Sequence, residues 1–191
     1  KWLPLGTLLH KYNPQESPGC SSCSMHREDW VHFLTCPDRS YWIGSLHAAL
    51  RTYMEKHNTY PLLQDLLIDA IREWLHRPLS LPNFSQYPDV IQPLIKKQSS
   101  IGWDQLFLGR FVKECREVQQ RHLDITASPN DLSTATSCPS GLIQTIWEQV
   151  YILWDHRNKD KHGIDEASQQ ALLTVRVQHD TEAPYNVRAT T

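Results

Sequence analysis

Residues 20–36 read CSSCSMHREDWVHFLTC and hold three of the five cysteines in the chain. Cys20 and Cys23 are separated by two residues, and His32 and Cys36 by three. A Cys-x2-Cys turn directs both thiolates at one ion, and residues four apart lie on the same side of a helical turn. The spacing C-x2-C-x8-H-x3-C therefore predicts a structural zinc site with Cys20, Cys23, His32 and Cys36 as ligands.

The residues inside this motif bear on the choice of ligands. The acidic pair Glu28-Asp29 favours the start of a helical turn, because acidic side chains are stabilising near a helix N-terminus. We interpret both as ordinary capping acids. His26 is an alternative fourth ligand, but it lies only three residues after Cys23 and would close a cramped ring. His32 is the better candidate.

Beyond residue 40, apolar residues recur every three or four positions, which predicts amphipathic helices separated by proline-rich breaks. The predicted helices cover residues 41–57, 60–77, 101–123 and 141–160, with shorter candidates at 90–97 and 164–178. Gly163 is suited to capping the helix over 141–160. The segment 126–140 is rich in Ser, Thr, Pro and Asn and is typical of a surface loop.

The N-terminal segment differs from the rest of the chain. Residues 1–18 contain three prolines and one glycine and few periodic apolar positions, so we expect them to be extended or turn-like. The sequence predicts a mostly α fold in which a small zinc knuckle packs on an all-helical domain. The predicted organisation is an extended segment with the knuckle over 1–40, a helical domain over 41–178 and a disordered tail over 179–191.

Composition narrows the functional classes. The 191 residues are 40% hydrophobic and include seven Trp, which is enough for a packed core. A formal charge of -2 argues against a strongly basic nucleic-acid binder but permits a local basic face. No run approaches the ~20 apolar residues of a membrane helix, and no signal peptide is recognisable. Together with the odd number of cysteines, this predicts an intracellular protein, cytoplasmic or nuclear.

Several residues other than the four metal ligands are candidates for contact with RNA or DNA, because they combine positive charge with neighbouring aromatic side chains. These candidates are Arg27 and Trp30 in the knuckle and, further along the chain, Arg110, Lys113, Arg157, Lys159 and Lys161. A simpler interpretation also stays open, since cations complement a helix C-terminus and solvate an exposed helix face.

Catalytic chemistry is not indicated by any pattern in the sequence. Cys115 falls on the apolar face of its predicted helix, and Cys138 falls in the predicted loop without a His or carboxylate patterned around it. The sequence contains no phosphate-binding glycine loop, nucleophile elbow or HExxH motif. We therefore expect no enzyme.

Several short motifs resemble one known family. The residues KWLPLG at 1–6, the C-x2-C pair, the acidic pair Glu28-Asp29 and HFLTCP at 32–37 resemble the zinc-binding region that follows the polymerase in reverse transcriptases of retroelements without long terminal repeats. Residues 101–110 and 147–163 are similar to the helical tail found after that knuckle in repetitive open reading frames of algal and other protist genomes.

The resemblance implies that the chain is a C-terminal part of a retroelement polyprotein, a view in keeping with its first residue, Lys1 rather than Met. It also implies that the knuckle helps to engage template RNA or target DNA, with the upstream polymerase domain as a further partner. The chain has no Tyr/Phe-x-Asp-Asp pair, so a polymerase active site is not expected in it. The residues leave open a second function, a structural or protein-interaction domain with a zinc-stabilised N-terminus.

Overall fold

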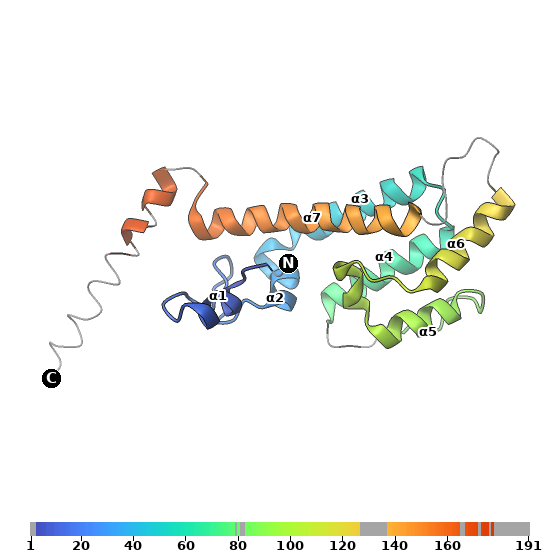
Figure 1. Cartoon of the computed structure of the whole chain (residues 1–191), viewed down its shortest axis with the longest axis horizontal. Helices are drawn as coiled ribbons and strands as arrows, with labels where there is room; N and C mark the ends of the chain where they lie inside the picture. The colour runs from blue at the N-terminus through green and yellow to red at the C-terminus, as the bar shows by residue number, and fades with distance from the viewer. Residues whose placement is uncertain are drawn as a thin grey trace. The chain divides into compact units, whose positions relative to one another are not determined.

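The computed structural model of the chain describes residues 3–78, 80, 83–126, 137–164, 167–171, 173–175 and 177. Throughout these residues the regular structure is helical, and no strand occurs among them (Figure 1). The prediction of a mostly α fold is confirmed. In the same part of the chain, no helix combines the length and the apolar character needed to cross a membrane.

The N-terminal segment contains a helix, α1 (Gly6–Tyr12). This corrects the expectation that residues 1–18 are extended or turn-like. The first turn of a helix has backbone donors without partners inside the helix, and here Glu28 supplies acceptors for two of them. The amide of Gly6 donates to Oε2 of Glu28 at 3.0 Å, and the amide of Thr7 donates to the Glu28 carbonyl at 3.1 Å.

A short helix, α2 (Trp30–Thr35), follows the Cys-x2-Cys pair. Asp29 is its N-cap and accepts a hydrogen bond from the His32 amide at 3.0 Å, which confirms its prediction as a capping acid. The helix ends at Thr35 because Cys36 precedes Pro37, and a residue before proline is pushed out of the helical region; its ψ is 123°. The 3-10 helix η1 (Pro37–Arg39) comes next.

The two helices predicted over 41–57 and 60–77 are confirmed as α3 (Tyr41–Lys56) and α4 (Pro61–His76). The proline at the start of α4 occupies the first turn, where its missing amide hydrogen costs nothing. Both helices bury one apolar stripe each, made of side chains spaced three or four apart. The stripes consist of Trp42, Leu46, Leu50 and Met54 on α3, and Leu63, Leu66, Leu67, Ile71, Trp74 and Leu75 on α4.

The single helix predicted over 101–123 is wrong. The structure has α5 (Gln92–Ile101), the 3-10 helix η2 (Trp103–Leu108) and α6 (Lys113–Thr126) in this region. The helices are separated at Gly102, with φ 100°, and at Gly109, with φ 74°. Both values lie in the left-handed region that glycine adopts without steric cost, so the chain turns at these positions instead of continuing as a helix. The apolar period alone did not reveal these breaks.

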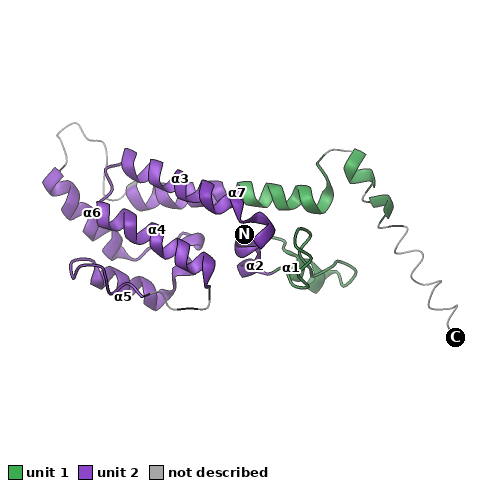
Figure 2. Ribbon diagram, turned by 180° about the vertical axis from the view of Figure 1, so that it is seen from behind, with its two compact units in different colours: residues 1–28, 152–191 green, residues 29–151 purple. Residues whose placement is uncertain are grey.

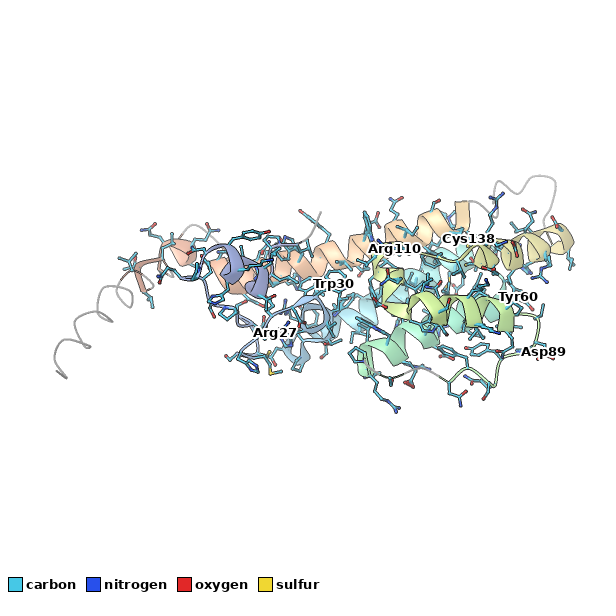
Figure 3. The ribbon with its side chains drawn as sticks, turned by 60° about the horizontal axis from the view of Figure 1, so that its bottom comes forward. Arg27, Trp30, Tyr60, Asp89, Arg110 and Cys138 are labelled. Carbon is cyan, nitrogen blue, oxygen red and sulfur yellow. The ribbon has the colours of Figure 1, made fainter. Side chains whose placement is uncertain are left out.

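The longest helix, α7 (Ser137–His162), begins four residues before its predicted start at 141. Cys138 therefore lies in its first turn (Figure 3) and not in a loop, and its side chain is buried. Gly163, with φ 91°, caps the helix as predicted, and its amide donates to the Lys159 carbonyl at 2.8 Å. Further along, residues 167–171 and 173–175 are helical within the candidate segment 164–178.

The chain divides into two compact units (Figure 2). Unit 1 consists of Lys1–Glu28 with Ile152–Thr191, and unit 2 is Asp29–Tyr151. The core of unit 2 combines apolar side chains of α3 to α7, among them Leu50, Met54, Leu63, Leu66, Ile71, Leu94, Leu106, Phe107, Val118, Leu142 and Ile146. The predicted tail over 179–191 lies outside the described residues.

Candidate metal centre

Four potential metal ligands come together near the N-terminus. One ligand atom each from Cys20, Cys23, His32 and Cys36 lies within 4.8 Å of all the others. Cys20 and Cys36 are buried, while Cys23 and His32 are half-buried. In a tetrahedral zinc site with Zn–S bonds of about 2.3 Å, neighbouring sulfurs are about 3.8 Å apart. The group predicted from the spacing thus exists in the fold and could bind a metal ion such as zinc.

A tight turn positions the first two ligands. The amide of Cys20 donates to the Met25 carbonyl at 2.8 Å, and the amide of Ser24 donates to the Cys20 carbonyl at 3.2 Å. Ser24 has φ 60°, a left-handed conformation that is uncommon for a residue other than glycine. This conformation reverses the chain directly after Cys23, so that both thiols of the Cys-x2-Cys pair face the same side.

Helix α2 positions the other two ligands. His32 is its third residue, and Cys36 follows its last residue, so the two are one helical turn apart. The helix is anchored by Phe33 and Leu34, whose side chains are completely buried. His26, the alternative ligand considered from the sequence, is exposed and does not belong to the group of four. The structure therefore favours His32.

Glu28 has a role that the sequence did not indicate. Its side chain is fully buried and accepts hydrogen bonds from the guanidinium of Arg157, with Nη2 at 2.5 Å and Nε at 3.1 Å from Oε2. The Gly6 amide donates a further hydrogen bond to the same oxygen. The expectation that Glu28 is an ordinary capping acid for the helix that follows it is corrected, because it caps α1 and forms a buried ion pair.

Arg157 is consequently not available as a phosphate contact, and its place among the predicted nucleic-acid-binding residues is corrected. Its side chain is 1% exposed and its charge is directed at Glu28. The guanidinium carbon also lies 4.9 Å from the ring centre of Trp154. In the sequence Arg157 lies two and four positions before Lys159 and Lys161, in a charged helix end where a solvated side chain is expected. No local signal distinguishes it from its neighbours.

The remaining lysines predicted to contact nucleic acid are all engaged in ion pairs. Lys161 lies 3.3 Å from Glu16, and its side chain is only 16% exposed. Lys159 pairs with Asp155 at 2.7 Å, and Lys113 pairs with Glu117 at 3.4 Å. Both of these pairs are solvent-accessible, and such pairs are worth little and exchange readily. Lys113 and Lys159 therefore remain compatible with an anionic ligand.

The three other candidates differ in exposure (Figure 3). Arg27 and Arg110 are exposed, and Arg110 donates to Oε1 of Gln105 at 2.9 Å. Trp30 is half-buried, with its ring centre 5.8 Å from that of Phe33. Its indole Nε1 is buried and has no hydrogen-bond partner among the described residues. Trp30 is thus mainly a packing residue, and only part of its ring is accessible for stacking.

The two cysteines outside the group are buried in unit 2. Burial raises the pKa of Cys115 to about 12, and the nearby Cys138 adds to this effect. Burial also raises the pKa of Cys138, although a hydrogen bond with Thr59 acts in the opposite direction. Thiolates are the reactive form of cysteine. Both side chains therefore stay protonated at neutral pH.

Comparisons of the chain with known protein families, with curated proteins and with solved structures give no match. The basis for a functional proposal is accordingly the group of four ligands and the accessibility of the charged and aromatic side chains around the two units.

Proposed function

We propose that this chain is a zinc-stabilised helical interaction module, in which one Zn²⁺ bound by Cys20, Cys23, His32 and Cys36 maintains the fold of the N-terminal segment. The observation that carries the proposal is the convergence of three sulfurs and an imidazole nitrogen within 4.8 Å. This ligand set suits Zn²⁺, and four protein ligands leave no coordination position for a substrate. The role of the ion is therefore structural.

The segment between α1 and α2 has little else to stabilise it. Of residues 13–29, only Cys20 and Glu28 have buried side chains. Apolar burial is the main favourable term in folding, and this segment contributes almost none of it. Zinc binding in small motifs supplies on the order of 10 kcal/mol, which is sufficient to order a segment of this length. The metal would thus replace a hydrophobic core here.

The second part of the proposal concerns the ligand of the module. The resemblance of the motif to the zinc-binding region of retroelement reverse transcriptases suggests that the module engages RNA or DNA as part of such a protein. The exposed Arg27, which lies between the second and third ligands, supports this part. With a net charge of -2, the contact would depend on a local surface instead of the overall charge.

Metal analysis of the purified full chain tests the zinc site. We expect one zinc per chain, and we expect Cys20→Ser and Cys36→Ser each to reduce this value strongly, because a lost thiolate leaves an incomplete tetrahedron. Cys138→Ser is the matched control, since it removes a thiol that lies outside the group and hydrogen-bonds Thr59. A wild-type chain that takes up no zinc from a zinc-containing buffer would refute the site.

Binding of a fluorescent 20-nucleotide single-stranded RNA, and of the matching DNA, tests the ligand. Affinity should fall steeply as salt is added, because phosphate contacts release counterions, and Arg27→Gln should weaken it. A flat salt response or the absence of binding rejects the nucleic-acid part of the proposal. The metal analysis is unaffected by that result, so the two parts can fail separately.

A second candidate function is binding of a protein partner through α7. Trp147 and Tyr151 lie one turn apart and are 55% and 70% exposed. The indole of Trp147 is held in place by a hydrogen bond to the Phe107 carbonyl at 3.1 Å. Exposed aromatic side chains of this kind are typical of protein interfaces.

Titration calorimetry with the upstream polymerase domain that the resemblance implies tests this second function. Trp147→Gln and Tyr151→Gln should weaken the complex at least tenfold, the equivalent of about 1.4 kcal/mol or more. Tyr12→Gln is the control, because Tyr12 is 78% exposed but lies on α1. If all three variants bind like the wild type, α7 is not the interface.

A further inference from the structure

Helix α6 has one buried and one solvent-facing side. Its buried side chains are Cys115, Val118, Gln119 and Leu123. On the opposite side, exposed residues recur at helical spacing, three and four positions apart. This outer face, which we term the α6 face, consists of Lys113, Arg116, Glu117, Gln120 and Arg121.

The α6 face is hollowed as well as charged. The same five residues line an open depression of about 530 Å³. Three of them are cationic and one is acidic, so the depression has a net charge of +2, whereas the whole chain has a net charge of -2. The α6 face is therefore a local positive surface on a chain whose net charge is negative.

The cations of the α6 face are held loosely. Lys113 lies 3.4 Å from Glu117, but the two side chains are 79% and 54% exposed, so the pair contributes little and can be exchanged for another anion. Nε of Arg121 donates to the Glu117 carbonyl at 3.3 Å, which leaves its other nitrogens accessible. Arg116 forms no ion pair with any residue in the described part of the chain.

We infer that the α6 face binds the phosphodiester backbone of a nucleic acid. This inference rests on the nucleic-acid part of the proposed function and is independent of the zinc site. The three cations lie within nine residues, which corresponds to about 12 Å of helix axis and is enough to reach two or three phosphates. No aromatic side chain lines the depression, and Gln120 is its only uncharged polar residue. The contact is therefore to the backbone, without base preference.

The central test compares two double variants in binding to a 20-nucleotide oligouridine RNA. Each lost phosphate contact weakens binding about fourfold at 0.15 M salt, so Arg116→Gln with Arg121→Gln should weaken it about 15-fold. Arg51→Gln with Arg77→Gln removes the same charge from exposed positions on α3 and at the C-cap of α4 and should have little effect. Equal losses in the two double variants would mean that only total charge matters and would overturn the inference.

A substitution of opposite sign sharpens the test. Glu117→Gln removes the only carboxylate of the depression and should strengthen binding by up to about fourfold. Glu55→Gln, at an exposed acidic position on α3, is its control and should leave affinity unchanged. Glutamine is a good helix former, so all these variants should keep the circular dichroism of the wild type.

The outcomes separate the inference from the proposal on which it rests. If the wild type does not bind RNA at all, both the nucleic-acid proposal and the α6 face are rejected. If the wild type binds and the α6 variants bind equally well, only the α6 face is rejected. Equal affinity for the RNA and for the matching oligothymidine is expected, because the backbone is the contacted part; a preference above about tenfold would contradict a pure phosphate contact.

Discussion

Arg157 and Glu28 form a buried ion pair between residues 129 positions apart in the sequence. Nη2 of Arg157 lies 2.5 Å from Oε2 of Glu28, and the side chains are 1% and 0% exposed. Because the same carboxylate oxygen accepts the Gly6 amide, one acid joins the start of α1 to the end of α7 within unit 1. Both charges have lost their hydration, so each depends on the other for stability.

The first prediction follows from that dependence. Arg157→Met should lower the free energy of unfolding by about 3–5 kcal/mol, because it leaves the Glu28 carboxylate buried without its counterion. Adding Glu28→Gln should recover much of the loss, since an amide is cheaper to bury than a charge. Urea unfolding of the single and double variants measures both effects.

The exposed pair of Arg77 and Glu73 is the control for this experiment. Nε of Arg77 lies 3.8 Å from Oε2 of Glu73, and the arginine side chain is 71% exposed. Arg77→Met should change the free energy of unfolding by less than about 1 kcal/mol. Similar losses of stability for Arg77→Met and Arg157→Met would show that burial of the Arg157–Glu28 pair does not matter.

A second prediction concerns two glycines with opposite surroundings. A Cβ added at Gly6 would lie 2.6 Å from the Pro18 carbonyl oxygen, which is backbone and cannot rotate away. Gly6→Ala should therefore destabilise the chain by about 1–3 kcal/mol. Gly44 lies inside α3 with nothing within 4 Å of such a Cβ, so Gly44→Ala should stabilise it by about 0.5–1 kcal/mol. Thermal unfolding should show shifts of opposite sign, and equal shifts would contradict the packing at Gly6.

Local features explain which parts of this structure could be predicted from the sequence. The four ligands lie within seventeen residues, and the spacing alone indicated that they would meet. Helices α3 and α4 were predicted to within a residue or two of each end, because a continuous apolar stripe with a clear stop defines each of them. In these cases the interacting residues are near neighbours in the chain, and a periodic pattern records their contacts directly.

The features that could not be predicted depend on distant residues. Helix α1 is capped by Glu28, 22 residues after its first residue. The path between α5 and α6 is held by buried Gln98, which donates to the Gly102 and Arg110 carbonyls and accepts from the Val112 amide. In the sequence Gln98 falls between the helices predicted over 90–97 and 101–123, and nothing marks it as a buried residue. A buried polar side chain that satisfies a loop leaves no periodic signal.

A third prediction is a loss of stability in mild acid that depends on His47. Burial lowers the pKa of His47 from its ordinary value of 6.5, and the positive charges of Arg72, Arg51 and His76 lower it further. Asp69, paired with Arg72, is the acidic group next to these cations. The fold therefore favours neutral His47, whereas the unfolded chain takes up a proton near pH 6.5. The stability due to this residue is complete above pH 6.5 and is lost as the pH falls through the folded pKa.

Urea unfolding between pH 5 and 8 measures this effect. His47→Leu should flatten the acid side of the stability profile, because it removes the group that is protonated on unfolding. Arg72→Gln should make the loss of stability in acid smaller. It removes one of the charges that lower the pKa of His47, so the pKa values of the folded and unfolded chain come closer together. A profile identical to that of the wild type in His47→Leu would assign the acid sensitivity to other groups.

The last prediction uses hydrogen exchange to locate the effect of metal removal. On the zinc proposal, a chelator should speed exchange of the Cys20 and Ser24 amides, whose acceptors are the Met25 and Cys20 carbonyls. These hydrogen bonds lie in a segment with almost no apolar burial, so the ion is their main support. Peptides from α4 should keep their protection, because that helix is held by its own buried apolar stripe. If the chelator speeds exchange in α4 as much as in the knuckle, the metal supports the whole fold. If it speeds exchange in neither, the knuckle is stable without an ion and the structural role of zinc is refuted.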